Sequence, residues 1–388
     1  MFKALTRSLL TPLQLIIHDS RSLGVILMAC AAISMLISNS VFGETYIGLW
    51  LHEIHFPPAL HLPHSLLHWI NDGLMALFFF LVGMEIKREL MEGELADMKK
   101  ALLPVFAAVG GMLIPALFFN SFNKGTEYSH GWGIPMATDI AFSLGIASIL
   151  GKRVPVALKV FLTALAIIDD LGAIAVIALF YGGDMNWMML GGTVIVTVMI
   201  LLLAKKKGSF WLRVLLSLVL WYFVFNSGIH ATVAGVLFAF TIPMKELSRL
   251  EHKLHLPVNF IILPVFALAN TAIVLPAQIL DSLNNTLNYG ILAGLVIGKP
   301  VGILLFSYLL VKLKWGMLPE GVNWAQMAGV GMLAGIGFTM SIFIAALAFS
   351  DPASQDIAKI SILIASLLSV ILGSLTLLFF SKRLTTQP

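Results

Sequence analysis

Long apolar stretches recur along this chain, and they restrict its possible folds more than any other feature. In residues 155–181, for example, the only charged side chains are Lys159, Asp169 and Asp170. A helix of about 20 apolar residues crosses the hydrocarbon core of a bilayer. Only 11% of all residues are charged, compared with about 25% in soluble domains. The sequence therefore predicts an all-α integral membrane protein and excludes a soluble globular fold.

Twelve membrane-spanning helices are expected when the same length is applied to the whole chain. No linker or low-complexity segment divides them, so residues 1–388 are expected to form a single polytopic domain. The single Cys30 excludes an internal disulfide. The predicted spans are 22–39, 66–88, 101–121, 131–150, 155–181, 186–204, 209–225, 228–243, 257–273, 288–312, 325–349 and 357–380.

Basic residues gather on one side of these spans. Loops rich in lysine and arginine stay in the cytoplasm, so both chain termini are expected to be cytoplasmic. The opposite loops hold almost no basic residue besides Lys124 and Lys359. No basic and aromatic surface stripe indicates a nucleic-acid partner. The residues on the basic side are Lys3, Arg7, Lys99, Lys100, Lys152, Arg153, Lys205, Lys206, Lys207, Lys245, Arg249, Lys253, Lys312, Lys314, Lys382 and Arg383.

Two adjacent carboxylates, Asp169 and Asp170, lie in the middle of the fifth span. A charge at this depth is unfavourable, because hydrocarbon does not solvate it. Neighbouring helix residues point about 100° apart, so one acid can face a cavity while the other faces a helix contact. Burial and like-charge repulsion favour the protonated form of a carboxylic acid. We expect a small cation and protons to compete for this pair; two acids neutralised by a basic neighbour are the structural alternative.

The fourth and eleventh spans are each interrupted in the middle. Glycine and proline precede Thr138 and Asp139 in the fourth, and Gly331, Gly335 and Gly337 interrupt the eleventh. Broken helices at corresponding positions of two halves are the best sequence indication of a transporter site, because they expose charged half-helix ends and free carbonyls. Spans 3–5 would then correspond to spans 10–12 in opposite orientation. A capped kink and close packing of small residues remain as alternatives.

Lys299 stands in the middle of the tenth span. A buried lysine needs a partner, and Asp139, Asp169, Asp170 or a half-helix end can supply one. If Lys299 pairs with an aspartate, a sodium ion must displace it. Lys299 would then be a second proton carrier, since a desolvated lysine releases its proton more readily.

Other titratable groups lie at the ends of spans. They form either interfacial ion pairs and polar tips or an entrance whose protonation gates access, and the sequence does not decide between these interpretations. Histidine responds to pH in the physiological range, so a pH response is expected for this set. Its members are Glu85, Arg88, Glu89, His230, Glu251 and His252.

The first outer loop, residues 40–63, is the longest segment outside the cytoplasm. Short mixed runs in residues 41–56 predict a small outer β-hairpin. A cluster of histidines follows, but its spacing matches no zinc pattern, so a hydrated interfacial cluster is favoured over a metal site. The histidines are His52, His55, His61, His64 and His68.

In the site residues described above and in the longer motifs around them, the chain resembles the bacterial NhaA family of sodium/proton antiporters. The resemblance covers essentially the whole length, and several long motifs occur in the same order. One departure is the segment 243–249, which lacks the extra basic and histidine residues often found there. The motifs are residues 81–90, 137–142, 165–173, 297–300 and 335–341.

The resemblance implies a single transporter domain with twelve helices, of which the fourth and eleventh are broken and cross in mid-membrane. Inverted repeats are a known property of this family. The repeat expected from the two interrupted spans is therefore not independent of the resemblance. The core helices would lie near 101–181 and 288–380, and the interface helices near 22–88 and 228–273. A homodimer joined partly through the outer hairpin is also implied.

The resemblance also implies roles for the site residues. Asp169 and Asp170 would bind sodium or lithium in exchange for protons, with Thr138 nearby, and Asp139 and Lys299 would balance the half-helix dipoles. Exchange would be electrogenic, driven by the proton gradient and activated at alkaline pH, and would serve pH and sodium homeostasis at the bacterial inner membrane. No cofactor and no catalytic reaction are expected. The positions tied to pH response are Glu85, Arg88, Glu89, His230 and Glu251.

Two other classes of function use similar features. A sodium-coupled symporter of a small anion could have the same broken helices, together with an anion pocket. An intramembrane aspartyl protease also has buried aspartates, but the chain lacks a Gly-x-Gly-Asp segment. The antiporter is therefore preferred, the symporter is the alternative, and the protease ranks last.

Overall fold

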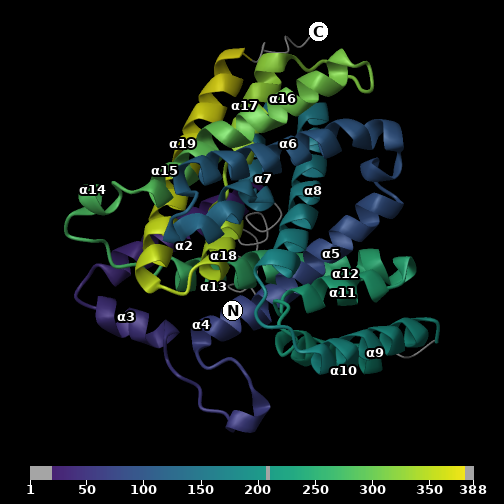
Figure 1. The fold of residues 1–388 in the computed structure, drawn as a ribbon. Coiled ribbons are helices and arrows are strands. Elements are labelled where there is room, and N and C mark those ends of the chain that lie inside the picture. The colour runs from purple at the N-terminus through teal and green to yellow at the C-terminus, as the bar shows by residue number, and fades with distance from the viewer. Residues whose placement is uncertain (1–19, 207–209, 381–388) are drawn as a thin grey trace, which may run out of the picture.

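The structure is a computed structural model that describes residues 20–206 and 210–380. Every regular element in these two stretches is a helix, and the only strand-like pairing there is an isolated bridge between Glu53 and Ser65. Five predicted basic positions, Lys3, Arg7, Lys207, Lys382 and Arg383, lie outside the described residues, as do both chain termini. The helices pack into one bundle (Figure 1).

Seven helical stretches in the described residues are long and apolar enough to cross a membrane. Two bent helix pairs qualify as well if each pair is one span, and their bends are 43° and 46°. The all-helical, multi-pass membrane architecture is therefore confirmed with seven to nine candidate spans. The seven are Leu66–Met91, α6 (Met98–Asn123), α8 (Val156–Phe180), α9 (Trp187–Ala204), Met244–Asn270, Thr286–Lys312 and α19 (Pro352–Phe380). The pairs are η4 (Glu127–Met136) with α7 (Ile140–Ile149), and α17 (Trp324–Ala334) with α18 (Phe338–Ala348).

Three of the long stretches contain a π-helical segment. Such wider turns occur often at functional sites, and here each lies at or beside a buried or half-buried polar residue. The first stretch comprises α4 (Leu66–His68), η2 (Trp69–Leu74) and α5 (Met75–Met91); the second α12 (Met244–Pro257), η6 (Val258–Ile262) and α13 (Leu263–Asn270); the third α15 (Thr286–Leu292), η7 (Ala293–Gly298) and α16 (Lys299–Lys312).

Shorter helices occupy the remaining predicted span positions. Small helices and single turns connect the spans. The helices at span positions are α2 (Ser20–Ser38), α10 (Phe210–Phe225) and α11 (Val233–Thr241). The connecting helices and turns are α3 (Gly43–Trp50), η1 (Pro58–Leu60), η3 (Glu94–Ala96), η5 (Gly151–Arg153) and α14 (Ile279–Ser282).

The predicted outer β-hairpin in residues 41–56 is wrong, because α3 occupies half of this stretch and no strand forms in it. Tyr46 and Trp50 lie one helical turn apart and pack edge to face, with ring centroids 5.7 Å apart. The Tyr46 hydroxyl also donates to Oγ of Ser34, at 3.0 Å. The contact with Ser34 holds α3 against α2. A local pattern of short apolar and polar runs does not reveal this contact, because the same pattern is typical of a β-strand.

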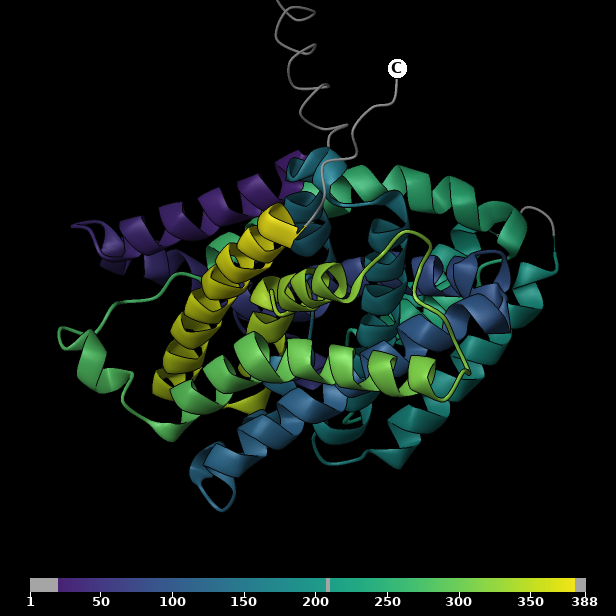
Figure 2. The same ribbon diagram turned by 90° about the horizontal axis from the view of Figure 1, so that it is seen from above.

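Glycines allow two pairs of spans to approach closely. A Cβ on Gly110 would overlap the carbonyl oxygen of Gly302, and one on Gly235 would overlap that of Ala76. Helix α6 therefore lies against α16, and α11 lies against α5. In Figure 2, α16, α17 and α19 (light green and yellow) lie on one side of the molecule and the teal helices α9–α12 lie on the other.

Basic side chains tie together one end of the bundle. Nζ of Lys87 donates to the carbonyl oxygens of Phe240 and Ile242, at 2.8 Å and 2.5 Å. Nη1 of Arg153 donates to the carbonyl oxygen of Leu378, at 3.1 Å. The ends of α5, α11 and α19 and the start of α8 thus lie at this end, which we call the basic end.

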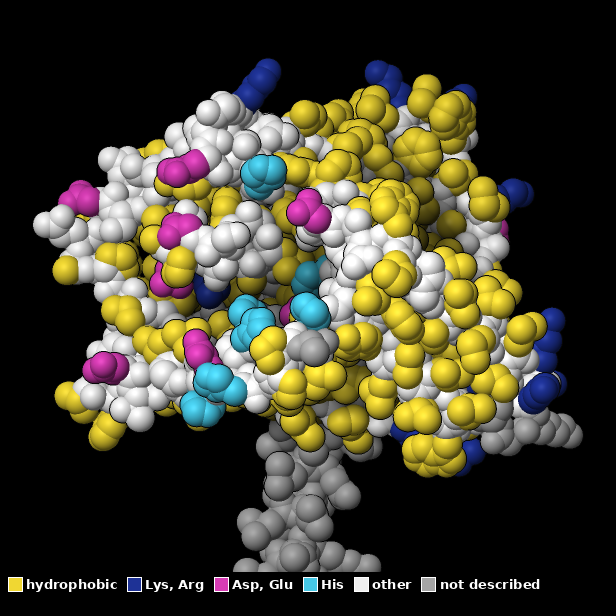
Figure 3. All heavy atoms as spheres, turned by 60° about the horizontal axis from the view of Figure 1, so that its bottom comes forward, with side chains coloured by type: hydrophobic (Ala, Val, Ile, Leu, Met, Phe, Trp, Pro, Cys, Tyr) yellow, Lys and Arg dark blue, Asp and Glu magenta, His cyan; other side chains and the backbone are white. Residues whose placement is uncertain are grey.

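The opposite end carries the first-loop histidines, and we call it the histidine-rich end. Here Nδ2 of Asn39 donates to the carbonyl oxygen of Ile273, and Nε1 of Trp221 donates to that of Asp72, at 2.8 Å and 2.9 Å. Figure 3 shows histidines and acidic side chains on this face, while most lysines and arginines in view stand at its edge. No group of three or more metal-ligating side chains forms among the described residues.

Candidate ion site

The two broken helices cross and hold each other through their interruptions. Between η4 and α7 the backbone is extended, and the amide of Asp139 donates to the carbonyl oxygen of Ile336, at 2.7 Å. The Ser341 hydroxyl donates to the carbonyl oxygen of Ile134, at 2.8 Å. Backbone groups freed by each interruption thus find partners on the other helix, as buried polar groups in a membrane must.

Asp139 caps two helices at once. Its Oδ1 accepts from the amide of Phe142 in α7, at 3.0 Å. Its Oδ2 accepts from the amide and the hydroxyl of Thr339 at the start of α18, at 3.2 Å and 2.5 Å. A carboxylate at a helix N-terminus stabilises the free amides and the positive dipole end. Asp139 therefore neutralises two half-helix N-termini that face each other at the crossing.

Lys299 pairs with Asp169 at the centre of the crossing. Its Nζ lies 2.6 Å from Oδ2 of Asp169, and it also donates to the carbonyl oxygen of Met136, at the end of η4. Both side chains are fully buried. The ammonium thus lies where a negative half-helix end and a carboxylate converge, and the wider turn of η7 comes directly before it.

Thr138 joins the same group. Its hydroxyl lies 2.7 Å from Oδ2 of Asp169 and 2.9 Å from the carbonyl oxygen of Ala334, at the end of α17. A hydroxyl has one proton to donate, so Thr138 can donate to either oxygen and offer a lone pair to a cation. The second oxygen of Asp169, Oδ1, is buried and has no hydrogen-bond partner. An unpartnered buried carboxylate oxygen is a fitting ligand for a proton or a hard cation.

Asp170 lies beside this group and lines a cavity of about 390 Å³. Asp169 is absent from the cavity wall, so the two acids face different surroundings, as their helical offset predicts. Asp139 and Thr339 line the same cavity. The site thus holds three buried carboxylates and a single buried ammonium, so it carries excess negative charge when it is fully ionised.

The cavity extends toward the basic end and ends at a group of charged side chains. Glu85, Arg88 and Glu251 line it. Nε of Arg88 lies 3.2 Å from Oε2 of Glu251, and Nη2 of Arg88 lies 3.3 Å from Oε1 of Glu89. The structure thus brings Glu251 of α12 together with Glu85, Arg88 and Glu89, which share the end of α5.

The predicted histidines lie elsewhere. His252 is exposed and does not line the cavity. His255 lines it instead, with Nε2 at 3.1 Å from Nδ2 of Asn259 in η6. His230 lies at the histidine-rich end, where its Nε2 is 3.2 Å from Oδ1 of Asp72. The six predicted titratable groups therefore do not form one cluster.

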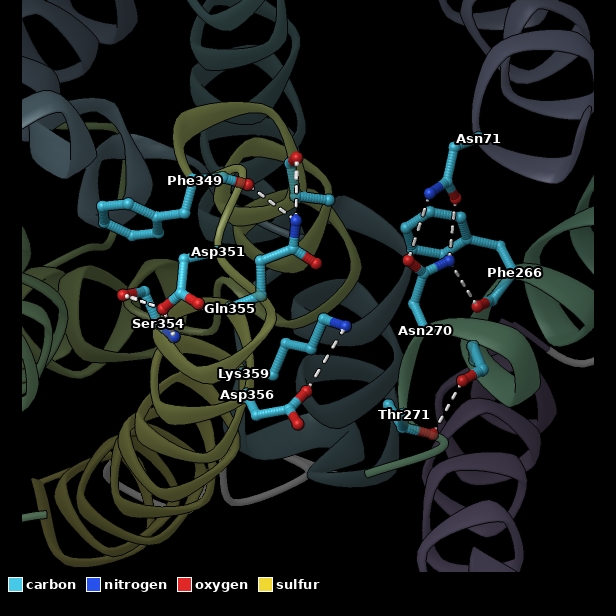
Figure 4. Close-up of polar contacts among 12 residues, drawn as sticks. Asn71, Phe266, Asn270, Thr271, Phe349, Asp351, Ser354, Gln355, Asp356 and Lys359 are labelled. Atoms are coloured by element: carbon cyan, nitrogen blue, oxygen red, sulfur yellow. Dashed lines mark hydrogen bonds and ion pairs between the residues drawn. The ribbon is translucent and has the colours of Figure 1, made fainter. Parts of the chain in front are cut away.

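Sequence analysis gave no role to Thr339 or Ser341, although both follow the glycines of the eleventh span. Their hydroxyls at a helix start were the available signal. Lys359, predicted at an outer span end, is buried, and its Nζ lies 3.9 Å from Oδ1 of Asp356 (Figure 4). No sequence signal indicated that burial, because it depends on how α19 packs.

Comparison with known proteins agrees with this site. The family model for Na+/H+ antiporter 1 matches residues 14–377. A protein of Flavobacterium johnsoniae named Na(+)/H(+) antiporter NhaA 2 is 48% identical over 95% of this chain and 93% of its own length. The Na(+)/H(+) antiporters NhaA of Shewanella frigidimarina and Citrobacter koseri are 50% and 49% identical, each over 90% of this chain and 92% or 93% of their own length. The chain therefore belongs to the Na+/H+ antiporter 1 family.

Proposed function

We propose that this protein exchanges sodium ions for protons across a membrane. The observation that carries the proposal is the buried Lys299–Asp169 ion pair inside the helix crossing, next to an Asp170 that faces a cavity. A buried charged group within a membrane span is functional by default. Relatives that share about half of their residues with this chain bear the name Na(+)/H(+) antiporter.

Exchange begins in the conformation that the structure shows. A sodium ion enters from the basic end through the cavity and reaches Asp170. It then takes the place of the Lys299 ammonium at Asp169, where the free Oδ1 and the Thr138 hydroxyl complete its oxygen ligands. Protons leave Asp170 and Lys299 as the cation binds. The crossing then moves as a unit and exposes the site to the opposite side, where protons return and sodium leaves.

Lys299 is the second proton carrier in this scheme. Removing a proton from Lys299 converts the ammonium into a neutral amine, which leaves Asp169 free for the cation. Two protons would then cross for each sodium ion, so exchange would be electrogenic and driven by the proton gradient. Lithium, a smaller cation with the same preference for oxygen ligands, would replace sodium. The other cationic group in the cavity lining, the Arg88 guanidinium, is already paired with Glu89 and Glu251, so this geometry favours a cation over the anion of a symporter.

The orientation follows from charge. We place the basic end in the cytoplasm of a bacterial inner membrane, and with it both chain termini. In this proposal α2, α10 and α11 also cross the membrane, which would give twelve crossings in total with the seven long spans and the two bent pairs. The broken pairs belong to inverted repeats, with η4–α7 and α17–α18 at equivalent positions, and the domain divides into the core and interface helices given above.

A pH response and a homodimer complete the proposal. Charges at the cavity mouth, from Glu85, Arg88, Glu89 and Glu251, set a pH response with activation at alkaline pH. A homodimer would form through the turn between α2 and α3, where Val41 and Phe42 are 93% and 69% exposed. This surface would form the dimer contact that the sequence analysis assigned to an outer β-hairpin.

The test is cation-induced dissipation of a pH gradient in everted vesicles. Asp170→Asn should abolish the response to sodium and lithium, whereas the exposed Asp184→Asn should leave it intact. A proton/cation exchange that survives Asp170→Asn unchanged would exclude the proposed site. Sodium-dependent uptake of a small anion, without proton movement, would exclude the antiport.

A further inference from the structure

Helix α10 carries one charged side chain, Arg213, in its first turn. An arginine this close to the end of a span can extend its guanidinium into water along the apolar surface. Here the side chain turns inward instead, and only 2% of it is exposed. A buried charge in a membrane helix is unfavourable and is functional by default. The ion exchange described above gives Arg213 no role.

The Arg213 guanidinium has a single ionised partner among the described residues. Its Nη2 lies 2.6 Å from Oε2 of Glu246, in the first turn of α12. Its Nε and Nη1 are buried and have no hydrogen-bond partner. The Phe210 ring lies 5.8 Å from Cζ, within the range of a cation–π contact. Glu246 therefore supplies the neutralising charge, and its loss would leave a buried guanidinium unpaired.

A second ion pair fixes α12 from another direction. Nε of Arg88, on α5, lies 3.2 Å from Oε2 of Glu251. Residues five positions apart on a helix point about 140° apart, so Glu246 and Glu251 reach toward different neighbours. The Arg213–Glu246 contact is the closer of the two and is aligned as a hydrogen bond, whereas Nε of Arg88 and Oε2 of Glu251 are not. The contact with α10 is thus the firmer hold on α12.

The face of α12 opposite Glu246 belongs to the ion pathway. His255 follows Glu246 by nine positions, or about 180° around the helix. His255 and Glu251 both line the cavity, whereas neither Arg213 nor Glu246 does. Arg213 can therefore act on the entrance only through the position of α12.

The Arg213–Glu246 pair lies outside the motifs on which the family resemblance depends. Glu246 belongs to the segment 243–249, in which this chain departs from the usual pattern. Leu247, the next residue, is fully buried, so this turn of α12 is packed into the bundle as well as paired with α10.

We propose that Arg213 is a positioning residue, which holds α12 in place at the cavity mouth. With the pair intact, Glu251 and His255 keep fixed positions at the entrance. When the pair is lost, α12 can roll about its axis, and the Glu251 carboxylate no longer attracts cations at a fixed point on their path. This assignment rests on the proposed exchange and adds to it a residue that sets how well the entrance captures sodium.

The first test measures the sodium concentration needed for half-maximal exchange in everted vesicles, at alkaline pH, where histidine is neutral. Glu246→Gln should raise this concentration by about fivefold, at the lower end of typical couplings between separate sites. The maximal rate should be retained, because the ion site is untouched. Arg213→Lys keeps a cation for Glu246 and should stay close to the wild type. Lys245→Gln is the matched control, since it changes an exposed charge in the same turn of α12.

A double variant separates positioning from stability. Arg213→Leu with Glu246→Gln removes both charges, so no buried guanidinium is left unpaired and most of the stability should return. The hold on α12 is still absent, and the raised sodium requirement should therefore remain. This variant also serves if Glu246→Gln alone does not fold.

The second test is amide hydrogen exchange of residues 244–257 in the purified protein, which needs no transport. Exchange should be about tenfold faster in Glu246→Gln and in the double variant, and unchanged in Lys245→Gln. A wild-type sodium requirement in the folded double variant would overturn the assignment, and so would unchanged amide exchange of α12. A wild-type protein that moves no protons in response to sodium would refute the antiport, while the amide exchange would still decide whether Arg213 holds α12.

Discussion

Nζ of Lys299 lies 2.6 Å from Oδ2 of Asp169, so the buried lysine pairs with the first of the two adjacent acids. The partners stand 130 residues apart in the sequence, and the sequence left Asp139, Asp169 and Asp170 as equal candidates. Pairing with Asp169 leaves Asp170 at the cavity, where we propose that a cation arrives first. The two acids thus differ in their surroundings: one pairs with Lys299 and the other lines the cavity.

Breaking the Lys299–Asp169 pair from one side should be strongly destabilising. Lys299→Met leaves a buried carboxylate without its partner, and we expect a loss of about 3–5 kcal/mol in unfolding free energy. The double variant Lys299→Met with Asp169→Asn removes both charges and should recover most of that loss. Thermal unfolding of the purified protein in detergent measures both. A double variant as unstable as Lys299→Met alone would contradict the pairing.

Thr339→Val should weaken the cap on α18. The variant keeps the shape of the side chain but removes the hydroxyl that donates to Asp139, at 2.5 Å. A buried acceptor that loses a donor costs about 1–3 kcal/mol. Thr339→Ser should restore most of the stability, because it keeps the hydroxyl. Equal melting temperatures for the valine and serine variants would show that the hydroxyl is not needed.

His255, rather than His252, should shape the pH dependence of exchange. His255 lines the cavity, and a protonated imidazole there adds positive charge on the path of an incoming cation. The concentration of sodium needed for half-maximal exchange should therefore rise as the pH falls and this imidazole takes up a proton. His255→Gln should remove that part of the rise, and the exposed His252→Gln should not. Dissipation of a pH gradient in everted vesicles, across a pH series, measures both; identical profiles would refute the assignment.

Glycine at the contact of α6 with α16 should be irreplaceable. Gly302→Ala puts a methyl group into the carbonyl of Gly110, and we expect a loss of about 1–3 kcal/mol from overpacking. Gly191→Ala in α9 has open space around the new methyl group and should gain about 0.5–1 kcal/mol. Thermal unfolding compares the two. A stabilising Gly302→Ala would contradict the close approach.

Sequence reasoning located the seven long spans and both bent pairs, because apolar length and mid-span glycine and proline are local signals. It placed Thr138, Asp139, Asp169, Asp170 and Lys299 in one site, as the structure does.

Features that depend on packing between distant segments could not be predicted. The choice of Asp169 by Lys299, the π-helical segments and the cavity position of His255 depend on neighbouring helices. The error at α3 has the same origin. Its helix is held by Ser34 on α2, which a local pattern does not reveal.

The cap that Asp139 provides has a mechanical consequence. One carboxylate terminates α7 from the first broken helix and α18 from the second, although about 200 residues separate them in the chain. Because the same carboxylate holds both half-helices, a tilt of one also moves the other. The crossing therefore couples the motion of the two broken helices. Neutralising Asp139 would uncouple α7 from α18. A conformational change that begins in one broken helix would then no longer be transmitted to the other.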